Sequence, residues 1–377
     1  MKRMRTRRRR GNILVLTAVL MTFMMAMLAL AVDAGVLATA RNELQRSADS
    51  AALAGCWELI DDSQLSGSVN AAIVGENARS KAGTFAGHNR IMGSVPSLAS
   101  SDVTIGYLND PGNNLEPISS PVGIMPNVVQ VRVQRSAAMN GNVPLFFAKA
   151  LGMDSIAAEA QATAAVVSSF NGFQTPGDGS NLGILPFALD ETTWNALLAG
   201  NANDNYEFDP DTGVVTAGSD GVKEVNLYPQ GTGSPGNRGT VDIGSCNNST
   251  NDIARQITDG ISPADLDHHG GSLEFDRNGE ISLNGDTGIS AGVKDELASI
   301  IGETRIIPIF RSVAGPGNNA QYTIVKFAGI RIMNVKLTGS MSGKNVMIQP
   351  ANVVAKGGIR GSVSRTNYVY SPVWLIR

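Results

Sequence analysis

The first hydrophobic pattern along the chain is an unbroken apolar run near its start. Residues 13–32 contain no charged residue, glycine or proline, and their only polar members are Thr17 and Thr22. A helix of this length is about 30 Å long, which matches the hydrocarbon core of a bilayer. The run therefore predicts a transmembrane signal anchor over residues 11–33, with anchoring side chains Ile13, Leu16, Leu20, Phe23, Leu28 and Val32.

After this run the pattern stays helical, but the side chains become small. Residues 34–60 contain no proline, and Leu37, Leu44 and Ala51 recur at seven-residue intervals. Seven of the nine residues 47–55 are alanine, serine or glycine. So narrow a helix face allows the backbone of another helix or of a sheet to approach closely. An ordinary alanine-rich core helix is the competing interpretation of the same spacing.

Beyond residue 93 the pattern becomes strand-like. Val129, Val131 and Val133 alternate with polar residues, which is typical of a strand with one buried face. Proline at the first turn and glycine at the end predict a short helix over 145–152. The first module, residues 34–171, is therefore expected to combine the long helix with a helix over 69–87, this short helix, and a small antiparallel sheet of strands over 102–108, 128–135 and 156–167.

Residues 172–181 are rich in glycine and proline and predict a linker. The domain beyond it, residues 182–377, alternates short β runs with turn residues, so the whole chain is expected to be an α+β protein. The elements predicted there are strands over 183–189, 222–228, 305–310, 322–327 and 330–337, a helix over 251–258 capped by Ser249 or Thr250, and a helix over 291–301 capped by Ser290 and ended by Gly302.

Charge is distributed unevenly along the chain. Of 377 residues, 30 are Lys or Arg and 33 are Asp or Glu, but seven of the basic residues lie in the first ten positions. The rest of the chain carries 23 basic side chains against 33 acidic ones and would repel phosphates, so no nucleic-acid partner is expected. By the positive-inside rule, the basic tail, residues 1–10, stays in the cytoplasm and the body is exported.

A cleaved signal peptide is the alternative interpretation of the apolar run. Ala29-Leu30-Ala31 matches the small-residue pattern of a cleavage site, and the basic residues before the run fit as well. Against cleavage, the run is longer than a usual signal-peptide core, and no glycine or proline interrupts it before the site. We favour a retained anchor, and in both cases the body leaves the cytoplasm.

The two cysteines of the chain, Cys56 and Cys246, are compatible with export. In an oxidising compartment they could form one disulfide. They could equally be two small buried residues, because the sequence does not show whether they are close in space.

The residues after the apolar run resemble a known family. The chain reads Leu44-Gln45-Arg-Ser-Ala48-Asp49-Ser-Ala51-Ala52-Leu53-Ala54-Gly55. The N-terminal module of TadE/TadG-like Flp pilus-assembly proteins has a similar Leu-Gln…Ala-Asp…Ala-Leu-Ala-Gly block directly after its membrane helix. Residues 128–135, 144–152 and 157–165 are also similar to the strand, aromatic-rich short helix and alanine-rich strand of that family, so the resemblance covers about residues 7–167.

This resemblance implies a component of a bacterial Flp/Tad-type pilus-assembly or secretion apparatus. It would be single-pass in the inner membrane, with its body periplasmic or extracellular, and pilus-assembly or secretion proteins would be its partners. Its contact with membrane lipid would be the one apolar helix. The residues expected to form a partner-contact helix, with the two polar ones setting its register, are Leu44, Gln45, Ala48, Asp49, Ala51, Ala52 and Gly55. On this hypothesis, Ala51→Trp abolishes partner association and leaves membrane insertion intact.

Two features found in relatives of this kind are missing from the sequence. The motifs that begin at Asp61 and Asp178 end in leucine, where the Asp-x-Ser-x-Ser metal site of a von Willebrand A domain needs serine. Gly11 is followed five residues later by Leu16, where prepilin peptidase substrates usually carry glutamate. We therefore expect neither metal-dependent adhesion nor processing as a major pilin.

Three other motifs imitate catalytic or metal-binding sequences. Residues 211–213 and 286–288 both read Asp-Thr-Gly, the loop that aspartic proteases use in pairs, but turn residues precede both, so exposed turns are expected. Residues 274–285 resemble a calcium loop that lacks the glutamate required at its last position, which favours a β-hairpin turn at 277–279. Residues 265–269 read Asp-Leu-Asp-His-His, but adjacent residues cannot easily chelate one ion, so a solvated loop is expected.

The sequence thus predicts no cofactor, no metal site and no enzyme, because it contains no nucleophile–base arrangement. Two alternatives to the membrane-anchored assembly component stay open. One is a secreted surface or matrix protein released by signal peptidase after Ala31. The other is an anchored hydrolase whose activity would require Asp211 or Asp286.

Overall fold

The computed structural model describes residues 12–67, 70–113, 116–121, 124–228, 238–244, 249–286, 289–315 and 320–376. The chain forms two compact units. Unit 1 comprises residues 1–59, 75–165 and 374–377, and unit 2 comprises residues 60–74 and 166–373. The units divide at Ala165 and Val166, whereas the sequence placed a linker at 172–181, whose first three residues belong to strand β6 (Phe170–Gln174).

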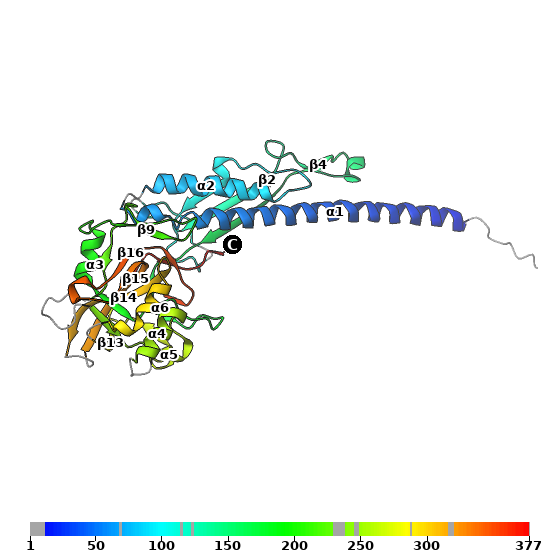
Figure 1. Cartoon of the computed structure of the whole chain (residues 1–377). Coiled ribbons are helices and arrows are strands. Elements are labelled where there is room, and N and C mark those ends of the chain that lie inside the picture. Colours follow the sequence, from blue (N-terminus) through cyan, green and yellow to red (C-terminus); the bar gives the residue numbers. More distant parts are fainter. Residues whose placement is uncertain are drawn as a thin grey trace, which may run out of the picture. The chain divides into compact units, whose positions relative to one another are not determined.

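A single helix, α1 (Asn12–Trp57), joins the apolar run to the small-residue segment without interruption (Figure 1). The hydroxyls of Thr17 and Thr22 donate to backbone oxygens one turn earlier, so the two polar side chains of the run do not break the helix. After α1 the chain forms α2 (Ala71–His88), a helix of 18 residues. The short 3-10 helices in the first half of the chain include η1 (Asp62–Gln64), η2 (Ser100–Asp102) and η3 (Ala148–Leu151). The helix predicted over 69–87 is therefore confirmed within two residues.

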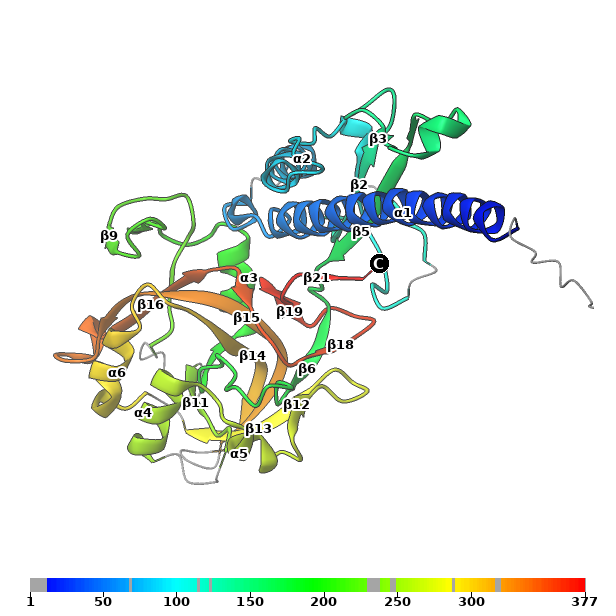
Figure 2. The same ribbon diagram turned by 90° about the vertical axis from the view of Figure 1, so that its right-hand side faces the viewer.

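The sheet of unit 1 has the strand order β1 (Val103–Gly106), β2 (Val128–Arg135), β5 (Ala158–Ala165) and β21 (Trp374–Leu375), with all pairs antiparallel. Val129, Val131 and Val133 are fully buried, as their alternation predicts. Val131 pairs with Ala162, and this small partner lets α1 pack closely across β2 and β5 (Figure 2). A separate pair, β3 (Val143–Pro144) and β4 (Ser155–Ile156), frames η3, so the predicted 156–167 strand is two strands and the predicted 145–152 helix is a shorter 3-10 helix.

Unit 2 is built around a closed ring of strands. The ring contains β15 (Ala320–Lys336), β13 (Ile281–Asp286), β11 (Arg238–Val241), β7 (Phe187–Asp190) and β14 (Thr304–Ala314), and β14 pairs back onto β15. The long curved strands β14 and β15 are drawn in orange in Figure 2. The same sheet continues to β16 (Asn345–Pro350) and β10 (Val225–Asn226), and β19 (Thr366–Asn367) pairs with β15.

The hydrophobic core of unit 2 lies between this sheet and its helices. Trp194 of α3 (Glu191–Leu198), Ile257 of α4 (Thr250–Asp259) and Leu297 of α6 (Lys294–Ser299) are fully buried in it. Ser249 caps α4, and Ser290 caps η4 (Ala291–Val293), which leads into α6, so both predicted helix starts are confirmed. The remaining elements are α5 (Pro263–Asp267), η6 (Met341–Gly343), β8 (Tyr206–Phe208), β9 (Val215–Ala217), β12 (Ser272–Glu274), β17 (Val353–Val354), β18 (Gly358–Arg360) and β20 (Val369–Tyr370).

Two strands that the sequence predicted separately in unit 2 form one strand, which passes through Gly329. The sequence separated strands 322–327 and 330–337, because a glycine between apolar runs resembles a break. Both belong to β15, which is 17 residues long. A Cβ on Gly329 would lie 2.5 Å from the carbonyl oxygens of Ala351 and Tyr368, so the glycine allows neighbouring backbone to pass the strand rather than ending it.

Candidate functional site

The exposed apolar half of α1 is the largest functional signal in the described part of the chain. The predicted anchoring residues have exposed fractions between 41% at Val32 and 77% at Ile13. The apolar part of this helix is not buried inside the protein, and no other helix among the described residues is long and apolar enough to cross a membrane. A soluble protein rarely leaves so much apolar surface in water, so the helix fits membrane anchoring.

Asp33, the first charged residue after the run, marks the end of this surface. Its side chain lies in the fold rather than in solvent, and the residue is only 6% exposed. Its carboxylate accepts hydrogen bonds from the backbone nitrogens of Phe146 at 2.8 Å, Phe147 at 3.1 Å and Ala148 at 2.6 Å. These are the amides at the start of η3, which have no partner within that helix, so Asp33 caps a distant turn.

This contact fixes the segment 145–153, called here the η3 segment, beside α1. Gly152 follows η3 with φ +84°, a left-handed conformation that favours glycine at a helix end. The sequence showed the short helix and the charge at the end of the run, but not that they meet across more than 110 residues. The sequence feature that could have indicated this contact is the position of Asp33 directly after the apolar run, because a carboxylate next to an apolar segment needs a polar partner.

The predicted partner-contact helix faces the core of unit 1 instead of a partner. Leu44, Ala48, Ala51 and Ala52 have no exposed surface. A Cβ on Gly55 would lie 3.0 Å from the Ala78 oxygen of α2, so the small face allows α2 of the same chain to approach. The assignment of these residues to a partner is therefore corrected, and Ala51→Trp would disrupt the fold of unit 1 rather than test association.

The polar pair Gln45 and Asp49 also acts within the chain. The Gln45 amide donates to the Asp49 carboxylate at 2.7 Å and to the backbone oxygen of Gln161 in β5 at 3.2 Å. A second polar contact joins the two helices, because the Ser47 hydroxyl donates to the Ala86 oxygen of α2 at 3.1 Å. These side chains set the position of α1 on its own sheet and against α2.

Comparison with protein families agrees with this reading of α1. Residues 11–71 match the family model described as "Putative Flp pilus-assembly TadE/G-like". This part of the chain is therefore similar to that family. The match includes the apolar run, Asp33 and the small-residue segment, which confirms the resemblance over residues 11–71. The likeness of residues 128–135, 144–152 and 157–165 to that family stays a prediction. No curated protein and no solved structure matches the chain significantly.

Cys56, near the end of α1, lies in the core of unit 1. Cys56 is fully buried and forms no disulfide with any described residue, and burial raises the pKa of its thiol to about 12. A thiol that is both buried and protonated is a poor nucleophile. Cys246 lies outside the described residues, so the disulfide considered from the sequence stays untested.

The two Asp-Thr-Gly motifs differ in their surroundings. Asp211 lies in the exposed turn of the β8–β9 hairpin, where the carboxylate of Asp209 accepts from the amide of Asp211 at 2.9 Å. Asp286, in contrast, lies at the end of β13 and pairs with Thr240 of β11, so the expectation of an exposed turn is wrong for this residue. Thr287 and Gly288 lie outside the described residues.

The calcium-like motif forms a turn, but the turn is not that of a hairpin. The Asp276 carboxylate accepts from the amides of Asn278 and Glu280, both at 2.9 Å, and Gly279 adopts φ +78°. The flanking strands do not pair with each other, because β12 pairs with β6 and β13 with β15 and β11. The predicted turn at 277–279 is therefore present, whereas the predicted hairpin is wrong.

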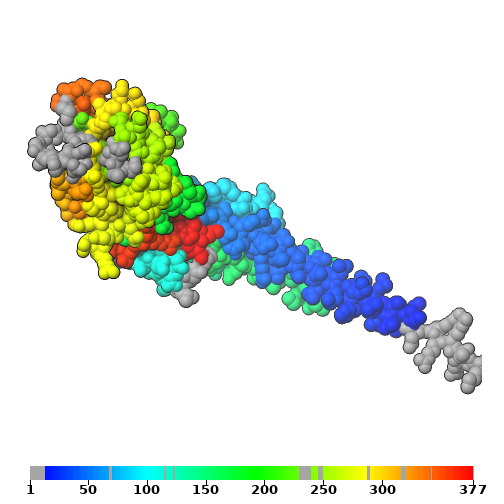
Figure 3. Space-filling model, turned by 90° about the horizontal axis from the view of Figure 1, so that it is seen from below, coloured from blue at the N-terminus to red at the C-terminus, as the bar shows by residue number. Residues whose placement is uncertain are grey.

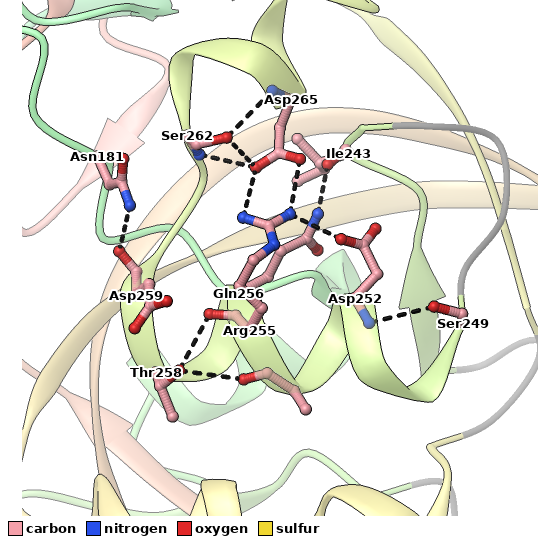
Figure 4. Close-up of polar contacts among 11 residues, drawn as sticks. Asn181, Ile243, Ser249, Asp252, Arg255, Gln256, Thr258, Asp259, Ser262 and Asp265 are labelled. Atoms are coloured by element: carbon pink, nitrogen blue, oxygen red, sulfur yellow. Dashed lines mark hydrogen bonds and ion pairs between the residues drawn. The ribbon is translucent and has the colours of Figure 1, made fainter.

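The acidic and histidine-containing motif is only partly solvated. Asp267 and His268 are exposed, but Asp265 is buried in α5. Its carboxylate accepts hydrogen bonds from the backbone amide of Ser262 at 2.8 Å and from the Ser262 hydroxyl at 2.7 Å. It also accepts hydrogen bonds from two guanidinium nitrogens of Arg255, at 2.8 and 3.1 Å (Figure 4). Asp265 thus has a structural role, which corrects the prediction of a solvated loop. In the part of the chain that the structure describes, no three His, Cys, Asp or Glu side chains are grouped to hold a metal ion.

Proposed function

We propose that this protein is a non-enzymatic, single-pass component of a bacterial Flp/Tad-type pilus-assembly or secretion apparatus. The helix α1 anchors it in the inner membrane, with the basic residues 1–10 in the cytoplasm and the body periplasmic or extracellular. The similarity of residues 11–71 to the TadE/G-like family and the exposed apolar half of α1 support this assignment. The cation-rich flank before the run supports the orientation.

The continuity of α1 is the observation that carries the proposal. The helix that begins as the exposed apolar run ends in the core of unit 1, where Leu44 and Ala51 are fully buried. The membrane segment is thus a continuation of the folded body. Cleavage after Ala31 would cut this helix in its middle and leave Asp33 at the second position of the new chain. The geometry therefore favours a retained anchor over a released secreted protein.

Contacts with pilus-assembly or secretion proteins are assigned to the exposed side chains of unit 1. The small face of α1 is occupied by the chain itself, whereas Leu20 in the apolar run is 56% exposed and Trp57 at the helix end is 46% exposed. No catalytic residue is assigned, because the exposed hairpin position of Asp211 and the strand position of Asp286 do not resemble paired protease loops.

Site-specific photo-crosslinking of the full-length chain in its native membranes tests this function. A photoreactive amino acid would replace Leu20 or Trp57, and Val214 would serve as the matched control because it is 51% exposed on the β9 hairpin of unit 2. Mass spectrometry would identify both the crosslinked proteins and the first residue of the recovered chain.

The expected result is an intact N-terminus with pilus platform, ATPase or secretin subunits crosslinked to position 20 or 57 and enriched over position 214. A mature chain that begins at Val32 and is recovered without those subunits would instead establish the secreted surface or matrix protein. Hydrolysis by the purified chain that is lost in Asp211→Asn or Asp286→Asn would overturn the non-enzymatic assignment.

A further inference from the structure

We infer that the η3 segment, residues 145–153, is a second membrane contact that enters the lipid interface beside α1. The inference rests on the proposed function in one respect, namely that α1 crosses a bilayer. It assigns a lipid surface to a segment 110 residues away from the anchor in sequence. Three observations support it: the segment exposes apolar side chains, it lies beside the apolar part of α1, and its backbone amides donate hydrogen bonds within the protein.

The η3 segment exposes large apolar side chains at an unusual density. Phe146 is 64% exposed, Phe147 49%, Leu151 85% and Met153 52%, so four of eight consecutive residues present apolar surface. Isolated exposed apolar residues are ordinary, but a cluster of this kind marks a protein or membrane contact. Protein segments that lie in the membrane interface typically carry Trp, Phe and Leu on the face that enters the lipid.

The position of the segment along α1 identifies the membrane as its partner. The segment and α1 enclose an apolar hollow of about 270 Å³, lined by Ala26, Ala29, Leu30, Asp33, Phe147, Ala148, Ala150 and Leu151. Figure 3 shows the green surface of this part of the chain lying along the blue surface of α1.

The rise per residue of α1 shows how far the η3 segment would reach into a bilayer around the apolar run. Ala26 precedes Asp33 by seven residues, which is about 10 Å along a helix axis. The η3 segment therefore extends beside α1 for about 10 Å into the part of the helix that forms the apolar run. Interfacial protein segments bury their apolar faces about 5–10 Å below the headgroup boundary, so the two depths agree. Any bilayer that surrounds residues 13–32 of α1 meets this segment too.

The backbone of the segment is suited to a medium without water. Irregular backbone enters lipid only where its polar groups have partners within the protein. Asp33 accepts from the amides of Phe146, Phe147 and Ala148, and the amides of Gly152 and Met153 donate to oxygens inside the turn at 3.0 and 3.1 Å. The amide of Leu145 donates to the Asp154 oxygen at 3.0 Å, which closes the base of the segment.

Lys149 completes the amphipathic character of the segment. Its side chain is 70% exposed, and its nitrogen is 3.9 Å from the Asp154 carboxylate, a long contact that leaves the ammonium free to reach further partners. A lysine at this level can extend its apolar stem along the lipid and place its charge among the phosphates. Anionic phospholipid then strengthens the contact through Lys149.

Depth-dependent quenching of a fluorophore in lipid vesicles tests the inference with the full-length chain. A nitrobenzoxadiazole label would be attached to Leu151→Cys, to Phe23→Cys in the middle of the apolar run, and to Val214→Cys in unit 2. All three would carry Cys246→Ser to remove one native thiol, and Cys56 is protected by burial. The vesicles would contain phosphatidylethanolamine and phosphatidylglycerol with spin labels at either carbon 5 or carbon 12 of an acyl chain.

The shallow quencher should act on position 151 at least twofold more strongly than the deep one, the deep quencher should dominate at position 23, and neither should act on position 214. Quenching at 23 with none at 151 would overturn the lipid contact of the η3 segment and leave the anchor intact. No quenching at 23 would overturn the anchor and, with it, this inference.

A label-free measurement guards against insertion driven by the fluorophore itself. The wild-type chain would be illuminated in vesicles doped with a phospholipid that carries a diazirine near its headgroup. Lipid adducts on the peptide that contains residues 145–153 support the contact, with the Phe146→Ser/Leu151→Ser variant expected to lose most of them. Adducts confined to residues 12–33 would contradict it.

Discussion

The carboxylate of Asp33 lies 2.6 Å from the backbone nitrogen of Ala148, although 115 residues separate them in the chain. Asp33 is the residue at which the apolar run of α1 ends, and Ala148 is the first residue of η3. The negative charge of the Asp33 carboxylate, which lies at the end of an apolar segment, is thus stabilised by hydrogen bonds from backbone amides. The same contact determines where the η3 segment lies along α1.

Replacing Asp33 with alanine should release the η3 segment. Hydrogen bonds to a charged group contribute about 1.5–3 kcal/mol each, so losing this shared carboxylate should lower the local opening free energy by about 2 kcal/mol or more. We expect amide hydrogen exchange of residues 145–153 in the full chain to accelerate by about 30-fold. Thr39→Val is the control, because the hydroxyl of Thr39 donates to the Gly35 oxygen of its own helix and not to the η3 segment. Unchanged exchange in Asp33→Ala would show that the carboxylate does not hold the segment.

Gly55 should tolerate no larger side chain. A Cβ there would lie 3.0 Å from the Ala78 oxygen, 3.2 Å from Val129 and 3.3 Å from Ala82, so Gly55→Val should destabilise unit 1 by about 3 kcal/mol through overpacking. Gly83→Val makes the same chemical change in α2 at a position with no atom within 4 Å of the added Cβ. Thermal unfolding in detergent would compare them, and equal melting temperatures would contradict the close contact.

Asp242 should make unit 2 less stable at neutral pH. Burial, together with repulsion from Asp252 and Asp286, raises the pKa of its carboxyl to about 6. Because the folded chain binds this proton more tightly than the unfolded chain does, stability falls as the pH rises from about 4 to above 6. Asp242→Asn should therefore raise the melting temperature at pH 7 and lose its advantage near pH 4. A pH-independent effect of Asp242→Asn would argue against the raised pKa.

Asp265 should show the opposite dependence. Burial opposes its charge, but hydrogen bonds from Arg255 and Ser262 lower the pKa of its carboxyl overall. Its stabilising contribution is present above a pH of about 4 and is lost as the pH falls through the lowered pKa. Asp265→Asn should lower the stability of unit 2 at pH 7 by about 2 kcal/mol, or about 5 °C in melting temperature. The exposed Asp259→Asn is the control, and an equal effect of both variants would remove the proposed role of Asp265.

Features determined by neighbouring residues could be predicted from the sequence. The helix of the apolar run could be predicted because 20 consecutive residues without charge, glycine or proline are typical of a membrane-spanning helix. The starts of α4 and η4 were predictable, because Ser249 and Ser290 cap through amides two or three residues away. The alternation of Val129, Val131 and Val133 was enough to predict a half-buried strand.

Features that depend on distant residues could not be predicted in this way. A small helix face has the same spacing whether it receives α2 of its own chain or another protein, so the sequence could not assign the partner of Gly55. Gly329 resembled a break because its neighbours Ala351 and Tyr368 come later in the chain. The partners of Asp33 were invisible for the same reason, although its place at the end of an apolar run was a usable hint.

The strand β21 has a consequence for how the protein is made. Trp374 and Leu375 pair with Ala165 and Ala164 of β5, and the Ile376 amide donates to the Thr163 oxygen at 2.8 Å. These residues follow all of unit 2 in the chain, and on the proposed topology the body would be exported from its N-terminal end onward. The unit that starts to emerge first is therefore completed last, and until residues 374–376 arrive, β5 keeps an open edge. Synthesis that stops within unit 2 would therefore leave unit 1 without its last strand and β5 with an unpaired edge.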